Sequence, residues 1–442
     1  MTEGEYPQDD NNLNHMLKYQ TPTGMHDLFE DDLQAYDKIE KICSNIADFY
    51  GFQKIETPIL EQAEVFEKGT GLTSDIVEKE MFSLRTKGGD ALCLRPEWTP
   101  SICRAYIQHG LANWPKPVKL WYFGPCFRYE RPQAGRFRQF YQFGFESLGS
   151  QDPLLDALTI QIFYNILKGL GFRNLVIELN SIGCSQCRPY FKKILSNYLR
   201  AKQASLCSDC KRRLKKNPLR VLDCKEEKCS RIKKTAPQIV DHLCKECHDH
   251  FKPLLEFLDE LALPYSLNPY LVRGLDYYTK TVFEIKNETE EGAGQGTLVG
   301  GGRYDGLVKL LGGKDTPGCG GAAGVERIVS LLRHGKTNAL PNPEDSTATV
   351  NIFLTQVGEL AKRKSLKLLE EMRVAKIKVG EALHKDSLSA QMRIADKMQA
   401  KYVLILGQKE ALDGKIILRE MKTGEQKIVA LDKVAQEVKK RA

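Results

Sequence analysis

The sequence predicts an α/β (α+β) protein with a large first domain, a basic cysteine-rich insertion within it, and a small C-terminal α/β domain. Helical and strand patterns alternate from Tyr19 to Leu332, and they alternate again after a segment rich in Pro, Asn, Ser and Asp. The chain has 442 residues, which is enough for two or three domains. Its 42% apolar and 28% charged residues are typical of globular proteins.

The patterns also predict where these parts begin and end. We expect a disordered tail over 1–17, a first domain over 18–335, the insertion over 184–251, an exposed linker over 336–348 and the C-terminal domain over 349–442. The first residues are polar and acidic, so they do not resemble a signal peptide. No apolar run approaches the roughly 20 residues needed to span a bilayer.

The first helix and strand of the large domain are predicted by spacing. Apolar residues recur at helical intervals from Leu33 to Phe49, and Gly51 then ends the helix before the strand-like FQKIETPIL. Beyond the linker, segments such as VNIFLTQV and YVLILGQ read as strands that alternate with helices.

A hairpin from Gly124 to Gly149 carries the clearest sign of a binding site. In its second arm, YQFGFE, residues two apart share a face, so Gln142 and Glu146 point away from the phenylalanines between them. Gly144 between them predicts a flat gap against bare backbone that a ligand occupies. Arg128 ends the first arm with donors suited to phosphate or carboxylate. Taken alone, the segment also fits an amphipathic surface hairpin with a solvated basic loop.

The insertion concentrates the positive charge of the chain. Between Arg188 and Lys234 there are sixteen Lys or Arg and four Asp or Glu, a net charge of +12, whereas the whole chain totals +8. The rest of the molecule is therefore mildly acidic. Such a distribution indicates a polyanionic partner, most often nucleic acid, although a solvated basic face without a partner is the alternative.

Two further clusters place arginines beside glycines. LVRGLDYYTKTVFEI puts Arg273 just before a strand, and GTLVGGGRYDG brings three glycines next to Arg303 and Tyr304. PGCGGAAGVERIVSLL reads as a strand of small residues that runs into a helix, with Arg327 in its first turn, an arrangement that favours phosphate. Neither cluster is a P-loop or a Rossmann fingerprint.

The thirteen cysteines predict a metal site and a reducing compartment. Their number is odd and the chain is large, so a cytoplasmic location fits better than a secreted disulfide protein. Cys184, Cys187, Cys207 and Cys210 form two CxxC pairs at the spacing of a structural zinc site. A second, less regular set follows, with His242 and His248 among its candidate ligands: Cys224, Cys229, Cys244 and Cys247. The alternative for both sets is reduced structural cysteines.

The chain resembles the histidyl-tRNA synthetases, which are class II aminoacyl-tRNA synthetases, over nearly its whole length from YQTPTGMHDL onward. TPIL around Pro58 resembles motif 1, FRYERPQAGRFRQFYQFGFE resembles motif 2, and GVERI resembles motif 3. LVRGLDYYTKTVFEI and GGGRYDGL resemble the two histidine-specific segments. The resemblance implies an antiparallel-sheet catalytic domain, a C-terminal anticodon-binding domain and a homodimer.

The same resemblance implies the reaction and its residues. The enzyme would activate L-histidine with ATP and Mg²⁺ and transfer it to the 3′ end of tRNA(His), releasing AMP and pyrophosphate. Arg128 would bind the α-phosphate, Arg327 the γ-phosphate, and Arg273 the charge that develops during attack. The histidine ligands would be Glu97, Thr99 and Gln142 at the α-amino group, Glu146 and Tyr278 at the imidazole, and Tyr277 and Tyr304 around them. Gln133, Arg136 and Arg138 would meet the tRNA acceptor end.

Two departures from the family and two alternative functions accompany this interpretation. The insertion is richer in cysteine than that of many members. Gly318 to Gly321 reads GCGG where a bulkier apolar residue is usual, which predicts a looser floor of the ATP site. A non-catalytic regulatory paralogue in histidine biosynthesis would lack the C-terminal domain and some of the arginines, all of which are present here. A nucleic-acid-binding module without catalysis would leave the polar pocket unexplained.

Overall fold

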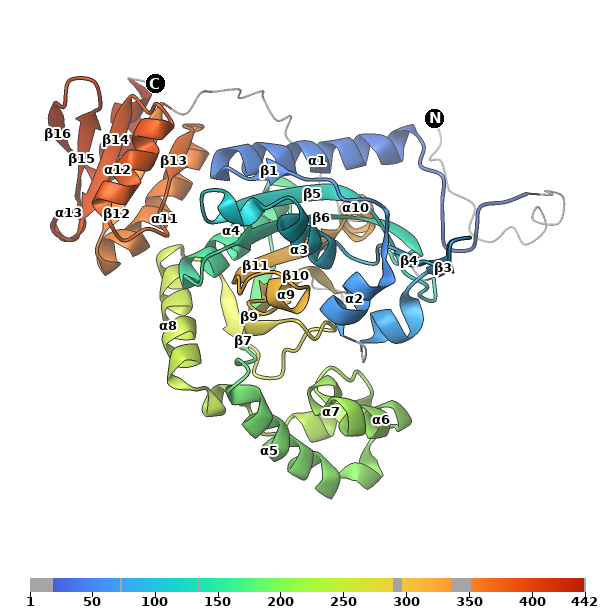
Figure 1. Cartoon of the computed structure of the whole chain (residues 1–442). Coiled ribbons are helices and arrows are strands. Elements are labelled where there is room, and N and C mark those ends of the chain that lie inside the picture. Colours follow the sequence, from blue (N-terminus) through green and yellow to red (C-terminus); the bar gives the residue numbers. More distant parts are fainter. Residues whose placement is uncertain (1–18, 72–73, 133–134, 289–295, 335–350, 441–442) are drawn as a thin grey trace.

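The computed structural model describes residues 19–71, 74–132, 135–288, 296–334 and 351–440. The predicted tail and linker lie outside these ranges. Figure 1 shows a central body, with the insertion in green at one end and the C-terminal domain in orange and red beside it. Within the described ranges, no helix combines the length and apolar composition that crossing a bilayer requires.

An eight-stranded sheet forms the centre of the body, in the order β1-β5-β6-β11-β10-β9-β7-β8. Its strands are β1 Gln53–Lys54, β5 Val118–Phe127, β6 Gln139–Leu148, β11 Gly318–Gly324, β10 Thr297–Arg303, β9 Thr279–Asn287, β7 Leu175–Ser181 and β8 Tyr265–Leu267. All neighbouring pairs are antiparallel except β1 with β5 and β7 with β8, at the two edges. The predicted antiparallel sheet is confirmed.

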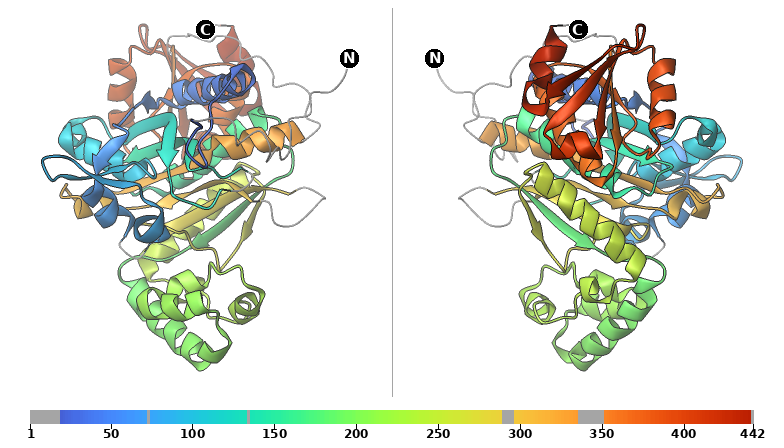
Figure 2. Two further views of the ribbon diagram at one scale, coloured as in Figure 1. Left: turned by 90° about the vertical axis from the view of Figure 1, so that its right-hand side faces the viewer. Right: turned by 90° about the vertical axis from the view of Figure 1, so that its left-hand side faces the viewer.

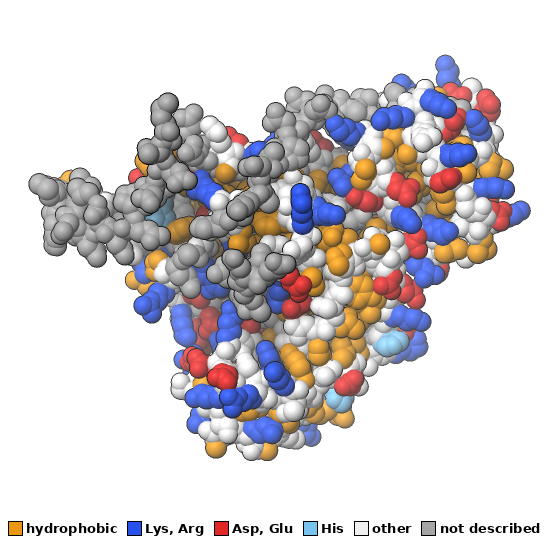
Figure 3. Space-filling view, turned by 180° about the vertical axis from the view of Figure 1, so that it is seen from behind, with side chains coloured by type: hydrophobic (Ala, Val, Ile, Leu, Met, Phe, Trp, Pro, Cys, Tyr) orange, Lys and Arg blue, Asp and Glu red, His pale blue; other side chains and the backbone are white. Residues whose placement is uncertain are grey.

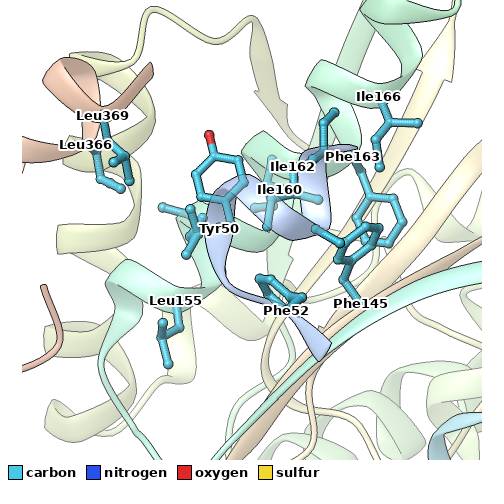
Figure 4. Packing of buried hydrophobic residues seen from close by; sticks show 14 of the residues in the cluster. Tyr50, Phe52, Phe145, Leu155, Ile160, Ile162, Phe163, Ile166, Leu366 and Leu369 are labelled. Carbon is cyan, nitrogen blue, oxygen red and sulfur yellow. The ribbon is translucent and has the colours of Figure 1, made fainter. Parts of the chain in front are cut away.

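Four helices and the sheet enclose the main apolar core (Figure 4). They are α1 Glu30–Tyr50, α4 Pro153–Gly169, α8 Lys245–Glu260 and α10 Val325–His334. Phe145 of β6 packs edge-on against Phe163 of α4, with ring centroids 5.6 Å apart, and also against Phe52. Helix α1 ends at Gly51, which has φ +73° and caps the helix in the left-handed conformation, as the sequence predicted.

A second apolar cluster covers the opposite side of β5 and β6. It includes Trp98, Tyr122, Tyr277 and Tyr304. The elements around it are helices α2 Ala63–Thr70, α3 Thr99–Gln108 and α9 Leu307–Leu310, the π-helical turn Ile76–Glu80, the 3₁₀ turn Leu111–Asn113, and a small sheet of β2 Leu60–Gln62, β4 Ala91–Leu94 and β3 Ser83–Arg85. The polar face of β6 opens into this side, where the candidate site lies.

The insertion is helical and has an apolar cluster of its own. Its elements are α5 Cys187–Ala201, α6 Ser208–Lys216 and α7 Glu227–Lys233, with 3₁₀ turns at Gln203–Ser205, Pro218–Val221 and Ile239–His242. Phe191 and Leu195 of α5 form part of that cluster, whereas Phe251 and Leu254 of α8 belong to the core of the body. Helix α8 therefore leads the chain from the insertion back into the body.

The C-terminal domain holds a five-stranded sheet in the order β13-β12-β14-β15-β16. Its elements are β12 Ile352–Val357, α11 Glu359–Val374, β13 Val379–Glu381, α12 Leu388–Lys397, β14 Tyr402–Gly407, α13 Gln408–Leu412, β15 Lys415–Glu420, β16 Gln426–Ala430, the 3₁₀ turn Leu431–Lys433 and α14 Val434–Lys439. Ion pairs join it to the body: Lys119 with Glu381, and Lys362 with Asp152. In both views of Figure 2 the insertion lies at the opposite end of the molecule from this domain.

Candidate functional site

The hairpin of β5 and β6 is built as its sequence predicts, but its glycine has another use. Phe143 and Phe145 are fully buried in the main core, and Gln142 and Glu146 lie on the opposite face of β6. The predicted gap at Gly144 is wrong, because the ring of Tyr122, its cross-strand partner, fills it. A Cβ at this position would overlap the Tyr122 hydroxyl. Glycine here accommodates a neighbouring side chain.

Glu146 is a buried carboxylate held by two hydroxyl groups. Thr99 Oγ1 donates to its Oε1 at 2.7 Å, and the Tyr304 hydroxyl donates to its Oε2 at 2.5 Å. The side chain is completely buried. Burial raises the pKa of Glu146 to about 8, although both hydrogen bonds act in the opposite direction. The group can therefore exchange a proton near neutral pH.

Glu97 is a second buried carboxylate with a similar pair of donors. Tyr277 donates to its Oε2 at 2.7 Å, and Thr70 donates to its Oε1 at 2.9 Å. Burial raises its pKa, and these hydroxyls together with the charges of Arg128 and Arg273 counteract that rise. The predicted histidine ligands thus divide between two carboxylates: Thr99 and Tyr304 serve Glu146, and Tyr277 serves Glu97.

Gln142 and Tyr278, the other predicted histidine ligands, contact different neighbours. The Cys126 thiol donates to Gln142 Oε1 at 3.4 Å. The ring of Tyr278 is 4.7 Å from that of Tyr277, and its backbone carbonyl accepts a hydrogen bond from Arg188. Burial raises the pKa of Tyr278 to about 12, so its hydroxyl remains a donor at neutral pH.

The glycine runs make room for these side chains. A Cβ at Gly320 would overlap the carboxylate of Glu146, and one at Gly300 would overlap the guanidinium of Arg273. Gly318 faces the Tyr304 ring in the same way. Of the GCGG segment, Gly318 and Gly320 therefore lie against Tyr304 and Glu146, and a side chain at either position would displace those groups.

The three predicted phosphate ligands reach the site from different elements. Arg128, at the end of β5, donates from Nε to the Pro96 carbonyl at 2.9 Å. Arg273 forms an ion pair with Glu284 of β9. Arg327 in α10 makes no ion pair with any described carboxylate, and burial together with the nearby charge of Arg136 lowers its pKa. A guanidinium without a carboxylate partner can bind an incoming anion without breaking an ion pair.

The predicted tRNA-contacting residues have different surroundings. Arg136 lies 3.4 Å from Glu130 and its side chain is half exposed. Arg138 stacks on the Tyr129 ring at 3.8 Å and donates to the Glu130 carbonyl, so local contacts hold it. Gln133 lies outside the described residues.

Several residues of the site were not predicted from sequence. Thr70 sits in a GTG turn, and that hydroxyl between two glycines was the available signal. Glu284 and Arg188 lie in ordinary strand and helix patterns and gave no signal. Arg303, which the sequence placed beside glycines, is fully buried against Asp156 at 2.5 Å, so it stabilises the fold instead of facing a ligand.

The cysteines of the insertion group differently from the prediction. One group of four, which we call the neck quartet, consists of Cys184, Cys187, Cys244 and Cys247. The other, the inner quartet, consists of Cys207, Cys210, Cys224 and Cys229. The sequence predicted a site that combines the pair Cys184 and Cys187 with the pair Cys207 and Cys210. That grouping is wrong, because the structure places the two pairs in different quartets. The first pair lies where the chain leaves the body, next to the pair at which the chain returns.

A cavity of about 180 Å³ lies between the insertion and the body. Its cations are Arg188, Lys192, Lys216, Arg220 and Arg273. Arg220 and Arg213 of the insertion also pair with Asp75, and Lys216 pairs with Glu78 at 2.5 Å. These contacts hold the insertion against the side of the pocket that carries Tyr278.

Comparison with known proteins accounts for both parts of this arrangement. The histidyl-tRNA synthetase family model matches residues 24–328, and an anticodon-binding domain model matches residues 351–441. The chain belongs to the histidyl-tRNA synthetase family. It is therefore a class II aminoacyl-tRNA synthetase, a ligase with a C-terminal anticodon-binding domain.

Individual relatives agree with this family over almost their full length. The histidine-tRNA ligase of Dehalococcoides mccartyi is 44% identical over 96% of this chain and 99% of its own. The histidine-tRNA ligase of Halothermothrix orenii is 43% identical over 96% of this chain and 100% of its own. The solved apo structure of S. aureus histidyl-tRNA synthetase is 32% identical, with a TM-score of 0.59, and covers 95% of this chain and 99% of its own.

Proposed function

We propose that L-histidine binds for activation in a pocket around Glu97 and Glu146, here called the two-carboxylate pocket. Glu146 accepts a hydrogen bond from the imidazole. The observation that carries this assignment is the pair of buried carboxylates, each held by two hydroxyl donors, beside three arginines. Glu97, with Gln142, binds the α-ammonium group, and Tyr278 contacts the other side of the ring. A site that bonds both ends of a substrate rejects analogues lacking those groups by about 10⁴ or more.

The nucleotide occupies the arginine side of the pocket as MgATP. Arg128 binds the α-phosphate and Arg327 the γ-phosphate, which suits a side chain with no described carboxylate partner. The histidine carboxylate attacks the α-phosphorus and pyrophosphate leaves with the electron pair of the broken bond. Arg273 stabilises the charge on the α-phosphate during this step. A terminal hydroxyl of the tRNA then attacks the adenylate carbonyl, and AMP leaves.

ATP-pyrophosphate exchange with each of the twenty amino acids tests this assignment. We expect exchange with histidine and none above background with the others. Exchange with a different amino acid would contradict the assigned pocket, and exchange with none would contradict catalysis.

The C-terminal domain and the basic surfaces provide the tRNA interface. The 349–442 domain binds the anticodon, Arg136 and Arg138 lie toward the acceptor end, and the basic insertion faces the phosphate backbone. Figure 3 shows Lys and Arg side chains distributed over the lower lobe of the molecule, where the insertion lies.

A chain ending at Asp345 separates the two steps. We expect it to retain histidine activation, since every proposed substrate ligand precedes the cut, and to lose most tRNA charging. The molar mass of the shortened chain is the control, because ion pairs such as Lys119 with Glu381 are removed. Full charging by a correctly assembled truncation would contradict the anticodon role.

A homodimer in the cytoplasm completes the proposal. Ile59 and Leu60, in the segment that resembles motif 1, are 41% and 45% exposed and offer apolar area for a second copy. All thirteen cysteines are free, which suits a reducing compartment. Light scattering checks the oligomer: a monomer at micromolar concentration would contradict this part.

A further inference from the structure

We propose that the insertion binds two structural zinc ions, one in the neck quartet and one in the inner quartet. This inference does not depend on the proposed function. In each quartet the four sulfur atoms lie within 4.8 Å of one another. Four converging cysteines are the ligand set of a closed structural zinc site.

The sulfur spacing matches a tetrahedron around one ion. A Zn–S distance of about 2.3 Å requires neighbouring sulfurs about 3.8 Å apart in a regular tetrahedron. Cys184 Sγ lies 3.8 Å from both Cys187 Sγ and Cys244 Sγ, and Cys207 Sγ lies 3.9 Å from Cys224 Sγ. A disulfide would bring two sulfurs to about 2 Å, and a multi-iron cluster needs a wider cage for its iron and sulfide atoms.

Backbone amides stabilise the charge that the ligands carry when bound. Gln186 N donates to Cys184 Sγ at 3.3 Å, and Cys244 N donates to Cys187 Sγ at 3.1 Å. In the inner quartet, Cys210 N donates to Cys207 Sγ and Cys207 N to Cys229 Sγ, both at 3.3 Å. Such contacts orient thiolate ligands and favour their negative form. The net negative charge of a zinc ion with four thiolates is offset by the basic insertion.

The two sites fasten different parts of the insertion. The neck quartet joins the start of α5 to the start of α8, 57 and 60 residues away for two of its pairs, and so closes the base of the insertion. The inner quartet joins the start of α6 to α7, and Cys210, Cys224 and Cys229 are buried in the insertion's own apolar cluster. His242 packs against Tyr190 and Phe191, and His248 pairs with Asp249, so neither histidine belongs to a quartet.

Metal analysis of the full-length protein, purified without added metal, tests both the ion and the grouping. We expect two zinc ions per chain. Cys187→Ser with Cys244→Ser changes one quartet twice and should leave one zinc. Cys187→Ser with Cys210→Ser changes both quartets and should leave none. Cys43→Ala, at a buried cysteine outside both quartets, should keep two.

Each contrary result overturns the proposal. No zinc in the parent protein, or iron in its place, contradicts the assigned metal. If Cys187→Ser with Cys244→Ser keeps no zinc and Cys187→Ser with Cys210→Ser keeps one, the assigned grouping is contradicted. Because serine variants can fail to fold, Cys244→His provides a second route, since histidine remains a zinc ligand. With cobalt(II) in place of zinc, this variant should show one four-sulfur site and one three-sulfur, one-nitrogen site. A spectrum identical to that of the parent contradicts the neck quartet.

Discussion

Glu146 and Glu97 are two buried carboxylates that have the same kinds of hydrogen-bond donors, yet their electrostatic surroundings differ. Each is buried and accepts hydrogen bonds from one tyrosine and one threonine. The charges of Arg128 and Arg273 act on Glu97, whereas the prominent charge acting on Glu146 is that of Glu97 itself. Hydroxyl donors alone therefore leave Glu146 with a pKa near 8, while cations favour the charged form of its neighbour.

Under the proposed function, this difference suits the two ends of a zwitterionic substrate. The charges of Arg128 and Arg273 oppose the rise that burial causes in the pKa of Glu97, and in the proposed function this carboxylate faces the ammonium group. A carboxyl that exchanges its proton near neutrality suits an imidazole, which itself titrates in that range. The predictions below test this distinction, beginning with the largest expected effect.

Arg273→Gln should reduce adenylate formation by about 10²–10³, because it removes a charge that stabilises the transition state. It should also raise the pKa of Glu97 further, since that arginine favours the charged carboxylate. Single-turnover adenylation measures the first effect. Arg231→Gln, at an exposed arginine on α7, is the control and should leave the rate unchanged. A loss no larger than in that control would remove Arg273 from the chemical step.

Glutamine substitutions distinguish the two carboxylates. Glu146→Gln should raise the histidine KM about 10- to 150-fold, the range expected for losing one buried charge-assisted bond of ~1.5–3 kcal/mol, with little change in the ATP KM. Glu97→Gln should also lower kcat, because it removes one of the negative charges that act on Arg128 and Arg273 and so changes how the two guanidinium groups are held. Steady-state exchange kinetics measure both constants. If the two variants changed KM and kcat equally, the proposed difference between the roles of Glu146 and Glu97 would be contradicted.

The affinity for histidine should depend on pH through the titration of Glu146. Its folded-state pKa of about 8 lies above the ordinary value of 4.5, so the folded state binds the proton more tightly. Its contribution to the free energy of unfolding is thus fully present below pH 4.5 and is lost as pH rises through 8. Histidine bonded to the carboxylate displaces this proton, so the affinity for histidine should increase as the pH rises toward the pKa of about 8.

Calorimetric titration of histidine between pH 6 and about 9 measures this dependence. Glu146→Gln is the control, because it retains the titration of the substrate imidazole but lacks the carboxyl. The same pH profile in both proteins would exclude Glu146 as the titrating group.

The smallest effects should come from the tyrosines. Tyr304→Phe removes one donor to Glu146 and should weaken histidine binding by ~0.5–1.5 kcal/mol while moving the pH profile upward. Tyr277→Phe removes one donor to Glu97 and should weaken binding by a similar amount without moving the profile. Comparing the two calorimetric midpoints separates the two roles. A shift of the pH profile in Tyr277→Phe but not in Tyr304→Phe would show that Glu97 titrates and would contradict the assignment to Glu146.

Sequence patterns predicted what depends on local repetition and missed what depends on distant contacts. The two-residue period of β6 correctly separated Glu146 from the phenylalanines, because side chains of a strand alternate regardless of context. The pairing of the cysteines was wrong because it is set by where α8 returns to the body. Thr70 and Tyr122 were missed because their roles depend on residues distant in sequence: Thr70 donates to Glu97, and Tyr122 fills the space at Gly144. Arg303, which the sequence places beside glycines, neutralises a buried aspartate.

Helix α8 gives the molecule a mechanical connection between its two ends (Figure 2). Near its start, Glu246 pairs with Lys280 at the beginning of β9. Near its end, Glu256 lies 3.3 Å from Arg363 on α11 of the C-terminal domain. Its sixteen residues span about 24 Å. Although Pro253 lies inside it, the helix is continuous, so one element contacts both β9 of the body and α11 of the anticodon-binding domain.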